Sequence, residues 1–484
     1  MHARRRTTPL PVLASAAVLA AACKVGPDYE PPEIDESVVT EDFGATEDPA
    51  FDASQTDIKE WWTVFEDPQL TSLIARAEEG NKDLAIAVSR VSEARARLGF
   101  AKAGKYPQVG ISGGIQAADD VFTGYETRTR TSIGADVSWE LDVFGRVARQ
   151  IESADAEFQA TQEDQRDVQV SLFAEVARAY IGVRALQMQL ESAQRNIDSQ
   201  REILTLTQAR VSSGISSDLD VARAVSILAA SEASVPPLRI NLAREVNTLG
   251  LLVGQNPTAL QDELAEPQEI PVPPASSAVG VPADLLRQRP DIRAAERRLA
   301  AQTARVGIAT ADLYPTFGID GTLGLNTIGG ADLFDPGSRN IALGPSRRWT
   351  RFDGGRRKAQ IAAEDAGVRQ AALLYERAIL SALEEVETSM TTFTEQGVRV
   401  STLERGANAA EEALRLATVL YQDGLIDYEQ VLDVQRTAIT QEIEVFNARG
   451  QAASSVVLLY RALGGGWDPS EEVTGEEPET STAP

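Results

Sequence analysis

The chain contains one internal repeat, in which corresponding positions lie about 210 residues apart. The two copies share their landmarks in the same order, beginning with a Tyr-Pro pair and ending with a Leu-Gly pair. The landmarks are Tyr106-Pro107 and Tyr314-Pro315, Trp139 and Trp349, Phe144-Gly145-Arg146 and Gly354-Gly355-Arg356, Gly214 and Gly424, and Leu249-Gly250 and Leu463-Gly464. We therefore expect a first repeat over residues 61–265 and a second over 283–466. Prolines in the connector, residues 266–282, prevent it from continuing a helix.

Each repeat predicts the same order of elements: a helix, two strands, a very long helix, a tight turn and another helix. In the first repeat, the stretch from Pro68 to Ala103 reads as one helix. The stretch from Arg146 to Arg210 has no proline and a single glycine, which predicts a helix of about 100 Å. Arg356 to Tyr421 repeats this design. Apolar residues at three- and four-residue steps in both stretches indicate coiled-coil packing.

Between these helices the apolar period changes from that of a helix to that of a strand. Residues 133–141 and 317–325 alternate apolar side chains with glycine or polar ones. Such strands suit a barrel with lipid outside and water inside, although a half-buried strand of a soluble sandwich shows the same alternation. The flanking helices are too long for a globular sandwich and favour the barrel. The loops from Gly113 to Arg130 and from Asn326 to Asn340 would then lie outside the cell.

Four strands per chain cannot close a barrel. Unpaired strand edges are not tolerated in lipid, and single-chain bacterial barrels begin at about eight strands. Three chains would supply twelve. We therefore expect an α+β membrane protein, a trimeric twelve-stranded β-barrel continuous with a long α-helical periplasmic tunnel and internally duplicated.

The N-terminus and the composition exclude several classes of function. Residues 1–22 read as a signal peptide, with a basic start and an apolar run too short to span a bilayer. The only histidine is His2, so the mature chain would hold no Ser/His/Asp triad and no histidine metal site. No phosphate-binding loop is present, and we expect no enzyme activity and no cofactor. The net charge of −26 argues against a nucleic-acid partner.

The only cysteine, Cys23, follows the run Leu19-Ala20-Ala21-Ala22. This run resembles the bacterial lipobox, which implies an acylated Cys23 and a lipid-anchored arm over residues 23–60. The lipobox prefers leucine three residues before the cysteine, where this chain has Ala20. Ordinary cleavage that leaves a free thiol is the alternative. Residues 467–484 are predicted to form an acidic C-terminal tail.

Several motifs resemble those of outer-membrane factors, the TolC-like family, and in particular its NodT-type efflux lipoproteins. The resemblance runs from Cys23 to about Trp467. The motifs are Cys23-Lys-Val-Gly-Pro-Asp-Tyr29, Trp61-Trp62, Phe65-Glu-Asp-Pro-Gln-Leu70, Asn81-Lys-Asp-Leu84, Tyr106-Pro107, Phe352-Asp-Gly-Gly-Arg356 and Leu432-Asp-Val-Gln-Arg436.

The resemblance implies a homotrimer in the cell outer membrane that extends into the periplasm. It also implies docking to a periplasmic adaptor and to an inner-membrane transporter of the resistance-nodulation-division (RND) class. The chain would be a passive exit duct for drugs or other small molecules. The outlet of a type I protein-secretion or metal-efflux system is an alternative, and a periplasmic coiled-coil scaffold lipoprotein is an alternative of another class.

Two sets of site residues follow from the resemblance. Gly214 and Gly424 look like the helix-hairpin tips that meet the adaptor, although a helix C-cap explains a glycine equally well. Asp433 and Arg436 look like the gate at the closed periplasmic end, and Gln430 stands where some relatives carry a second acidic residue. An exposed ion pair between Asp433 and Arg436 is the alternative.

One segment departs from the family pattern. Relatives usually have small or apolar residues before Phe-Asp-Gly-Gly, whereas this chain has Arg347-Arg348-Trp349-Thr350-Arg351. Arg347 and Arg351 share parity with the apolar face of the predicted strand. Either they extend to the periplasmic edge of the membrane, or this strand is shorter than in relatives.

Overall fold

The computed structural model of the protein describes residues 24–32, 51–52, 58–120, 125–272, 277–278, 288–328 and 332–468. These residues fall into two compact units, each built from both repeats. The first unit comprises Met1–Glu33, Arg90–Gln162 and Ala294–Glu376, and the second comprises Ile34–Ser89, Glu163–Arg293 and Arg377–Pro484. Within the described ranges, no helix carries an apolar stretch long enough to cross a bilayer.

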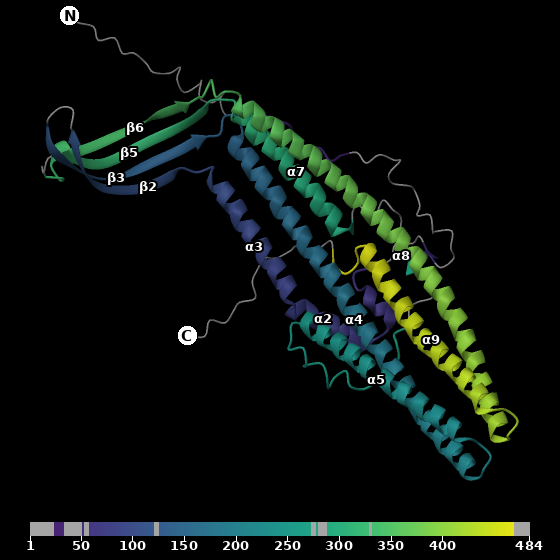
Figure 1. The fold of residues 1–484 in the computed structure, drawn as a ribbon. Helices are drawn as coiled ribbons and strands as arrows, with labels where there is room; N and C mark the ends of the chain where they lie inside the picture. The colour runs from purple at the N-terminus through teal and green to yellow at the C-terminus, as the bar shows by residue number, and fades with distance from the viewer. Residues whose placement is uncertain are drawn as a thin grey trace, which may run out of the picture. The chain divides into compact units, whose positions relative to one another are not determined.

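The first unit contains an antiparallel sheet in the order β2-β3-β5-β6. Its strands are β2 (Gln108–Asp120), β3 (Tyr125–Leu141), β5 (Thr316–Ile328) and β6 (Arg339–Arg348). They lie side by side as one curved sheet (Figure 1). The β3–β5 ladder joins the two repeats, because β2 and β3 belong to the first and β5 and β6 to the second.

The helices repeat as predicted. Both long helices, α4 (Arg146–Ser212) and α8 (Arg356–Gln422), have 67 residues. Both partner helices, α5 (Asp218–Leu252) and α9 (Tyr428–Ala462), have 35. In the second unit α4 and α5 form one hairpin and α8 and α9 form another (Figure 1). The remaining described elements are β1 (Phe51–Asp52), η2 (Trp61–Phe65), α2 (Pro68–Gly80), α3 (Lys82–Ala103), β4 (Ser277–Ala278), α7 (Pro290–Ala311) and η3 (Pro336–Ser338).

Three predicted segments, one helix and two loops, have other boundaries in the structure. The helix expected from Pro68 to Ala103 is divided at Asn81, which has an extended backbone. The Asn81 side chain accepts a hydrogen bond from the Leu84 amide at 2.9 Å and so caps α3, while its amide nitrogen donates to the Leu252 carbonyl at 2.8 Å. The two loops are also shorter than predicted, because backbone pairing continues through Gly114–Ala118 and through Asn326–Ile328.

The core of the second unit is built around aromatic residues from both ends of the chain. Trp61 stacks on Tyr460 with ring centroids 5.8 Å apart, and Trp62 meets Phe173 edge-on at 5.1 Å. All four side chains are buried. Ring contacts of this kind add about 0.5–1.5 kcal/mol each beyond the area they bury. They therefore tie the segment after residue 58 and the end of α9 to the middle of α4.

Candidate functional site

The sheet has two chemically different faces. Residues directly opposite each other in an antiparallel ladder point to the same side, so the register assigns each side chain to a face. One face is apolar: Val109, Ile111, Ile115, Ile133, Ala135, Val137, Trp139, Leu141, Phe317, Ile319, Leu323, Leu325, Ile341 and Leu343. The other is polar or glycine-rich: Gln108, Gly110, Ser112, Gly114, Ser132, Gly134, Asp136, Ser138, Glu140, Gly318, Asp320, Thr322, Gly324, Asn326, Asn340, Gly344 and Ser346.

Much of the apolar face is left uncovered by the residues that the structure describes. Ile111 is 86% exposed, Leu343 78% and Leu323 60%. Large apolar side chains over a whole sheet face are not left in water by a soluble protein. The face therefore fits a hydrocarbon surrounding.

The polar face carries carboxylates among glycines. Asp136 lies opposite Gly110, where an added Cβ would stand only 2.6 Å from the Asp136 Oδ2 atom. The missing side chain therefore leaves room for the carboxylate. Glu140 forms an ion pair with Arg146, at the first residue of α4. This face fits a water-filled surrounding.

The two repeats anchor the sheet in the same way. The Trp139 indole N–H donates to the Lys105 carbonyl at 3.0 Å, and the Trp349 indole N–H donates to the Leu313 carbonyl at 3.2 Å. In each case a strand end is fixed to the segment that follows a helix of the same repeat. An indole at this position combines an apolar body with a satisfied polar group, as aromatic residues at a membrane interface do.

The predicted tip residues lie where each hairpin turns. Gly214 has φ +72° and Gly424 has φ +77°. The Ile215 amide bonds to the Arg210 carbonyl and the Leu425 amide to the Leu420 carbonyl, which completes a Schellman motif at each tip. A Cβ would meet no atom within 4 Å at either glycine. Glycine is therefore favoured here for its positive φ and not because a side chain would lack room.

The predicted gate residues lie in the first turns of α9. Asp433, Arg436 and Gln430 are all exposed, at three-residue steps along the helix. Among the described residues no ion pair joins Asp433 to Arg436, in contrast to the alternative considered for this pair. The opposite side of the same turns is buried through Leu432 and Gln435. The exposed carboxylate is therefore directed away from the packing within the chain.

Sequence reasoning missed a link between the two hairpins near their tips. The Arg210 guanidinium donates to the Tyr421 carbonyl at 2.7 Å and lies 4.5 Å from the centroid of the Tyr421 ring. Arg223 of α5 lies 3.7 Å from Glu429 of α9. The only signal in the sequence was an arginine four residues before one tip glycine and a tyrosine three residues before the other.

Tyr428 lies in the same region and gives a pH-dependent prediction. Burial, with Tyr421 and Asp220 nearby, raises the pKa of Tyr428 to about 12. Between about pH 10 and 12 the unfolded chain would lose this proton while the folded chain keeps it. The free energy of unfolding should therefore fall with rising pH by about 1.4 kcal/mol per pH unit.

Tyr428→Phe should remove this alkaline loss. Its hydroxyl is buried without a hydrogen-bond partner in the described part of the chain, so the variant should be at least as stable at pH 8. Denaturant unfolding of both proteins at pH 8 and pH 11.5 measures the difference. An equal alkaline loss in the variant would contradict the prediction.

The first described segment, residues 24–32, is bound by a buried arginine that the sequence did not indicate. Arg149 of α4 has no exposed side-chain surface. It donates to the Val25 carbonyl at 3.2 Å, to the Gly26 carbonyl at 3.2 Å and to the Asp28 carboxylate at 2.7 Å. A Cβ on Gly26 would stand 2.5 Å from the Cα atom of Gly307, so this segment lies directly against α7. Cys23 lies outside the described residues.

The described ranges contain no group of three or more His, Cys, Asp or Glu side chains arranged to hold a metal ion. The functional geometry consists of the two-faced sheet, its unpaired edge strands and the hairpin tips.

Comparison with known proteins gives a consistent picture. Residues 73–255 and 281–465, more than half of the chain, match the family described as outer membrane efflux protein. Nodulation protein T of Rhizobium leguminosarum bv. trifolii is 30% identical over 97% of this chain and 99% of its own. The toluene efflux pump outer membrane protein TtgI of Pseudomonas putida is 31% identical over 84% and 87%. The solved structure of the outer-membrane channel OprN has a TM-score of 0.84 at 36% identity, over 92% of this chain and 100% of that chain.

Proposed function

The chain belongs to the outer membrane efflux protein family, and on this premise we propose that it is the outer-membrane channel subunit of a tripartite efflux system. It is located in the outer membrane and serves as a passive duct for drugs or other small molecules. It catalyses no reaction, and the energy for export comes from a partner pump.

The two-faced sheet is the observation that carries this proposal. Its apolar face suits lipid and its polar face suits an aqueous lumen. Strand β2 pairs only with β3, and β6 only with β5, among the described strands. Open edges of this kind are not stable in a bilayer, where each unpaired amide costs several kcal/mol. Three copies with four strands each would close a ring of twelve.

The partners follow from the hairpin tips. A periplasmic adaptor would bind the turns at Gly214 and Gly424, and an inner-membrane RND-type transporter would deliver the cargo. Exposed apolar side chains beside both turns support this contact: Ile215 is 67% exposed and Leu425 70%. Such side chains are favourable at the centre of a protein interface.

Cys23 is proposed as the lipid anchor. The next residue, Lys24, forms an ion pair with Glu152 of α4, and the Val25 amide bonds to the Phe144 carbonyl at 3.3 Å. Phe144 lies between the end of β3 and the start of α4. An acyl chain on the preceding cysteine would therefore start beside the end of the sheet, where it can enter the same membrane.

The gate assignment gives a prediction on conductance. Three copies of Asp433 around a common axis would repel one another and hold cations at the constriction. Asp433→Ala should therefore raise the conductance of the closed channel, whereas Gln430→Ala, without a change in charge, should alter it less. Single-channel recordings measure both variants. An unchanged closed-state conductance in Asp433→Ala would remove this residue from the gate.

Planar bilayers test the proposed function as a whole. Purified protein should form discrete channels that prefer cations, because Asp136 and Asp320 lie on the polar face of the sheet. The protein should also migrate as a heat-modifiable oligomer in gels. A protein that remains monomeric and forms no channels would contradict the proposal, and anion selectivity would contradict the expected lumen.

A further inference from the structure

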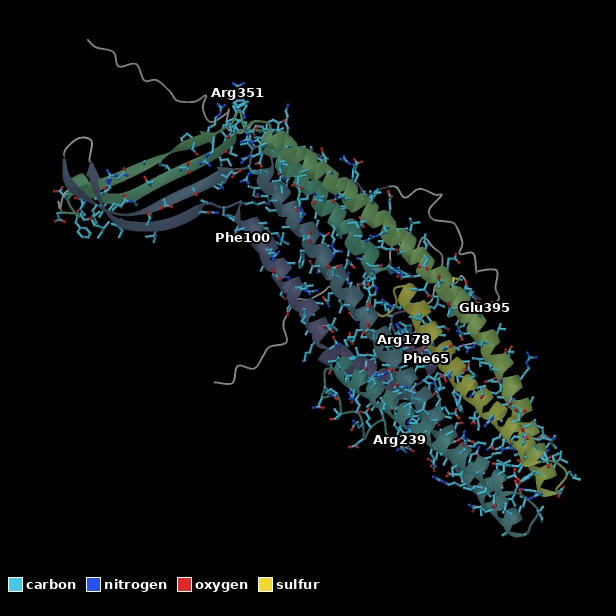
Figure 2. All side chains as sticks on the ribbon, in the orientation of Figure 1. Phe65, Phe100, Arg178, Arg239, Arg351 and Glu395 are labelled. Atoms are coloured by element: carbon cyan, nitrogen blue, oxygen red, sulfur yellow. The ribbon has the colours of Figure 1, made fainter. Side chains whose placement is uncertain are left out.

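Strand β6 ends in a basic and aromatic cluster. Arg347 is the second-to-last residue of β6, and Arg351 lies three residues beyond the strand. The Cζ atoms of the two guanidinium groups lie 5.4 Å and 4.8 Å from the centroid of the Trp349 ring. All three side chains are exposed. Figure 2 shows Arg351 where the sheet ends and α8 begins.

The cluster lies at the border of the apolar face. Arg347 is paired with Phe317 in the ladder and therefore points to the apolar side of the sheet. The hydrogen bond from the Trp349 indole to Leu313 fixes the ring that the cluster surrounds. Both arginines were predicted to share the parity of the apolar face. Strand β6 ends at Arg348, so alternation along the strand assigns only Arg347 to this face.

The first repeat provides an internal comparison. Trp139 corresponds to Trp349, and the positions equivalent to Arg347 and Arg351 are Val137 and Leu141. Anchoring a strand end through the indole therefore requires no arginine. The two guanidinium groups are therefore specific to the second repeat.

Neither guanidinium is neutralised by a carboxylate of the residues that the structure describes. Among the described residues, no carboxylate lies within ion-pairing distance of Arg347 or Arg351, in contrast to Arg357 nearby, which lies 3.6 Å from Asp353. A cation at the edge of the hydrocarbon is costly unless it reaches an anion. A phosphodiester accepts two parallel hydrogen bonds from one guanidinium, and tryptophan favours the level of the headgroups.

We propose that Arg347, Trp349 and Arg351 form a binding site for the phosphate headgroup of an anionic phospholipid in the periplasmic leaflet of the outer membrane. This inference rests on the proposed function, which places the end of β6 next to α8 at the periplasmic edge of the barrel. A site of this kind would set the depth of the barrel in the membrane at three points around the trimer.

Lipid binding by the full-length protein tests the site, with phosphatidylglycerol as the probe. Each basic side chain at an anionic lipid surface contributes about fivefold in affinity, so Arg347→Gln with Arg351→Gln should weaken binding about 25-fold. Native mass spectrometry of the detergent-solubilised oligomer counts the lipid that remains bound. Arg339→Gln is the matched control, because Arg339 is exposed, lies on the same face of β6 at its other end and is paired with Leu325. Lysine at both positions should restore only part of the affinity. An ammonium group keeps the positive charge but cannot make the bidentate contact.

The outcomes separate this inference from the proposed function. The double variant should still migrate as a heat-modifiable oligomer and conduct in neutral phosphatidylcholine bilayers. Equal phosphatidylglycerol binding by the wild type and the double variant would overturn the site and leave the channel standing. Loss of lipopolysaccharide binding with phosphatidylglycerol binding unchanged would overturn the assignment to the periplasmic leaflet. A wild-type protein that forms no channel would overturn the proposed function and the site together.

Discussion

Leu323→Arg should remove the protein from the outer membrane, while Thr322→Arg should leave it inserted. Leu323 lies at the middle of β5 on the apolar face and is 60% exposed. An arginine facing lipid at the bilayer midplane costs about 2–4 kcal/mol. A trimer would bear this cost three times. The sum is comparable with the whole free energy of unfolding of an ordinary domain, about 5–15 kcal/mol.

Thr322 is the matched control because it lies at the same depth on the other face. It is paired with Asp136 on the polar side of the sheet, where an arginine can remain hydrated. Membrane fractionation and heat-modifiable migration measure insertion for both variants. Thr322→Arg should change the ion selectivity of the channel instead. Equal insertion of the two variants would show that the apolar face does not contact lipid.

Arg149→Met should release the segment that follows Cys23 from the helices. The change removes the hydrogen bonds that Arg149 donates to the carbonyls of Val25 and Gly26, and a hydrogen bond to a charged group contributes about 1.5–3 kcal/mol. The Asp28 side chain is 78% exposed, so we assign little extra to its ion pair. Gly26 is exposed and Val25 is half-buried, so we take the lower end of that range for both bonds and expect a loss of about 3 kcal/mol in the docking of this segment.

Hydrogen exchange of the Val25 amide measures this docking. The amide is bonded to the Phe144 carbonyl, and its exchange should accelerate by about 100-fold in the variant. Arg305→Met is the control, since Arg305 lies 3.6 Å from Glu157 and both side chains are about half exposed. A surface pair of that kind contributes about 0–1 kcal/mol. Unchanged exchange in Arg149→Met would show that the segment is held by other contacts.

The sequence was sufficient for the parts of the fold that local periodicity determines. The duplication, the paired strands and the two long helices are confirmed, as are the family, the outer-membrane location and the efflux function. The division at Asn81 was missed although Gly80-Asn81 is a pair typical of a helix end, because a single glycine inside a long helical pattern is also tolerated. The short loops were missed because glycine and serine suit a two-faced strand as well as a turn.

The contacts that connect distant segments could not be predicted in this way. Arg149 and Arg210 lie in α4 among many other arginines, and nothing in the helical pattern separates a buried one from a solvated one. Their partners, the segment at Val25 and the turn at Tyr421, are 124 and 211 residues away. Only the folded chain brings these groups together. The roles of Cys23, Gly214, Gly424, Gln430, Asp433 and Arg436 remain predictions.

The β3–β5 ladder also indicates how the sheets of two neighbouring chains would pair. It joins the second strand of one repeat to the first strand of the next, and β6 would meet β2 of a neighbouring copy in the same sense. Carrying the register over through the duplication sets Pro345 opposite Ile115 and Leu343 opposite Ala117, with apolar side chains again on one side. A ring of three such chains would then be built from six nearly equivalent hairpins, a pseudo-sixfold arrangement in which seams within one chain alternate with seams between two chains.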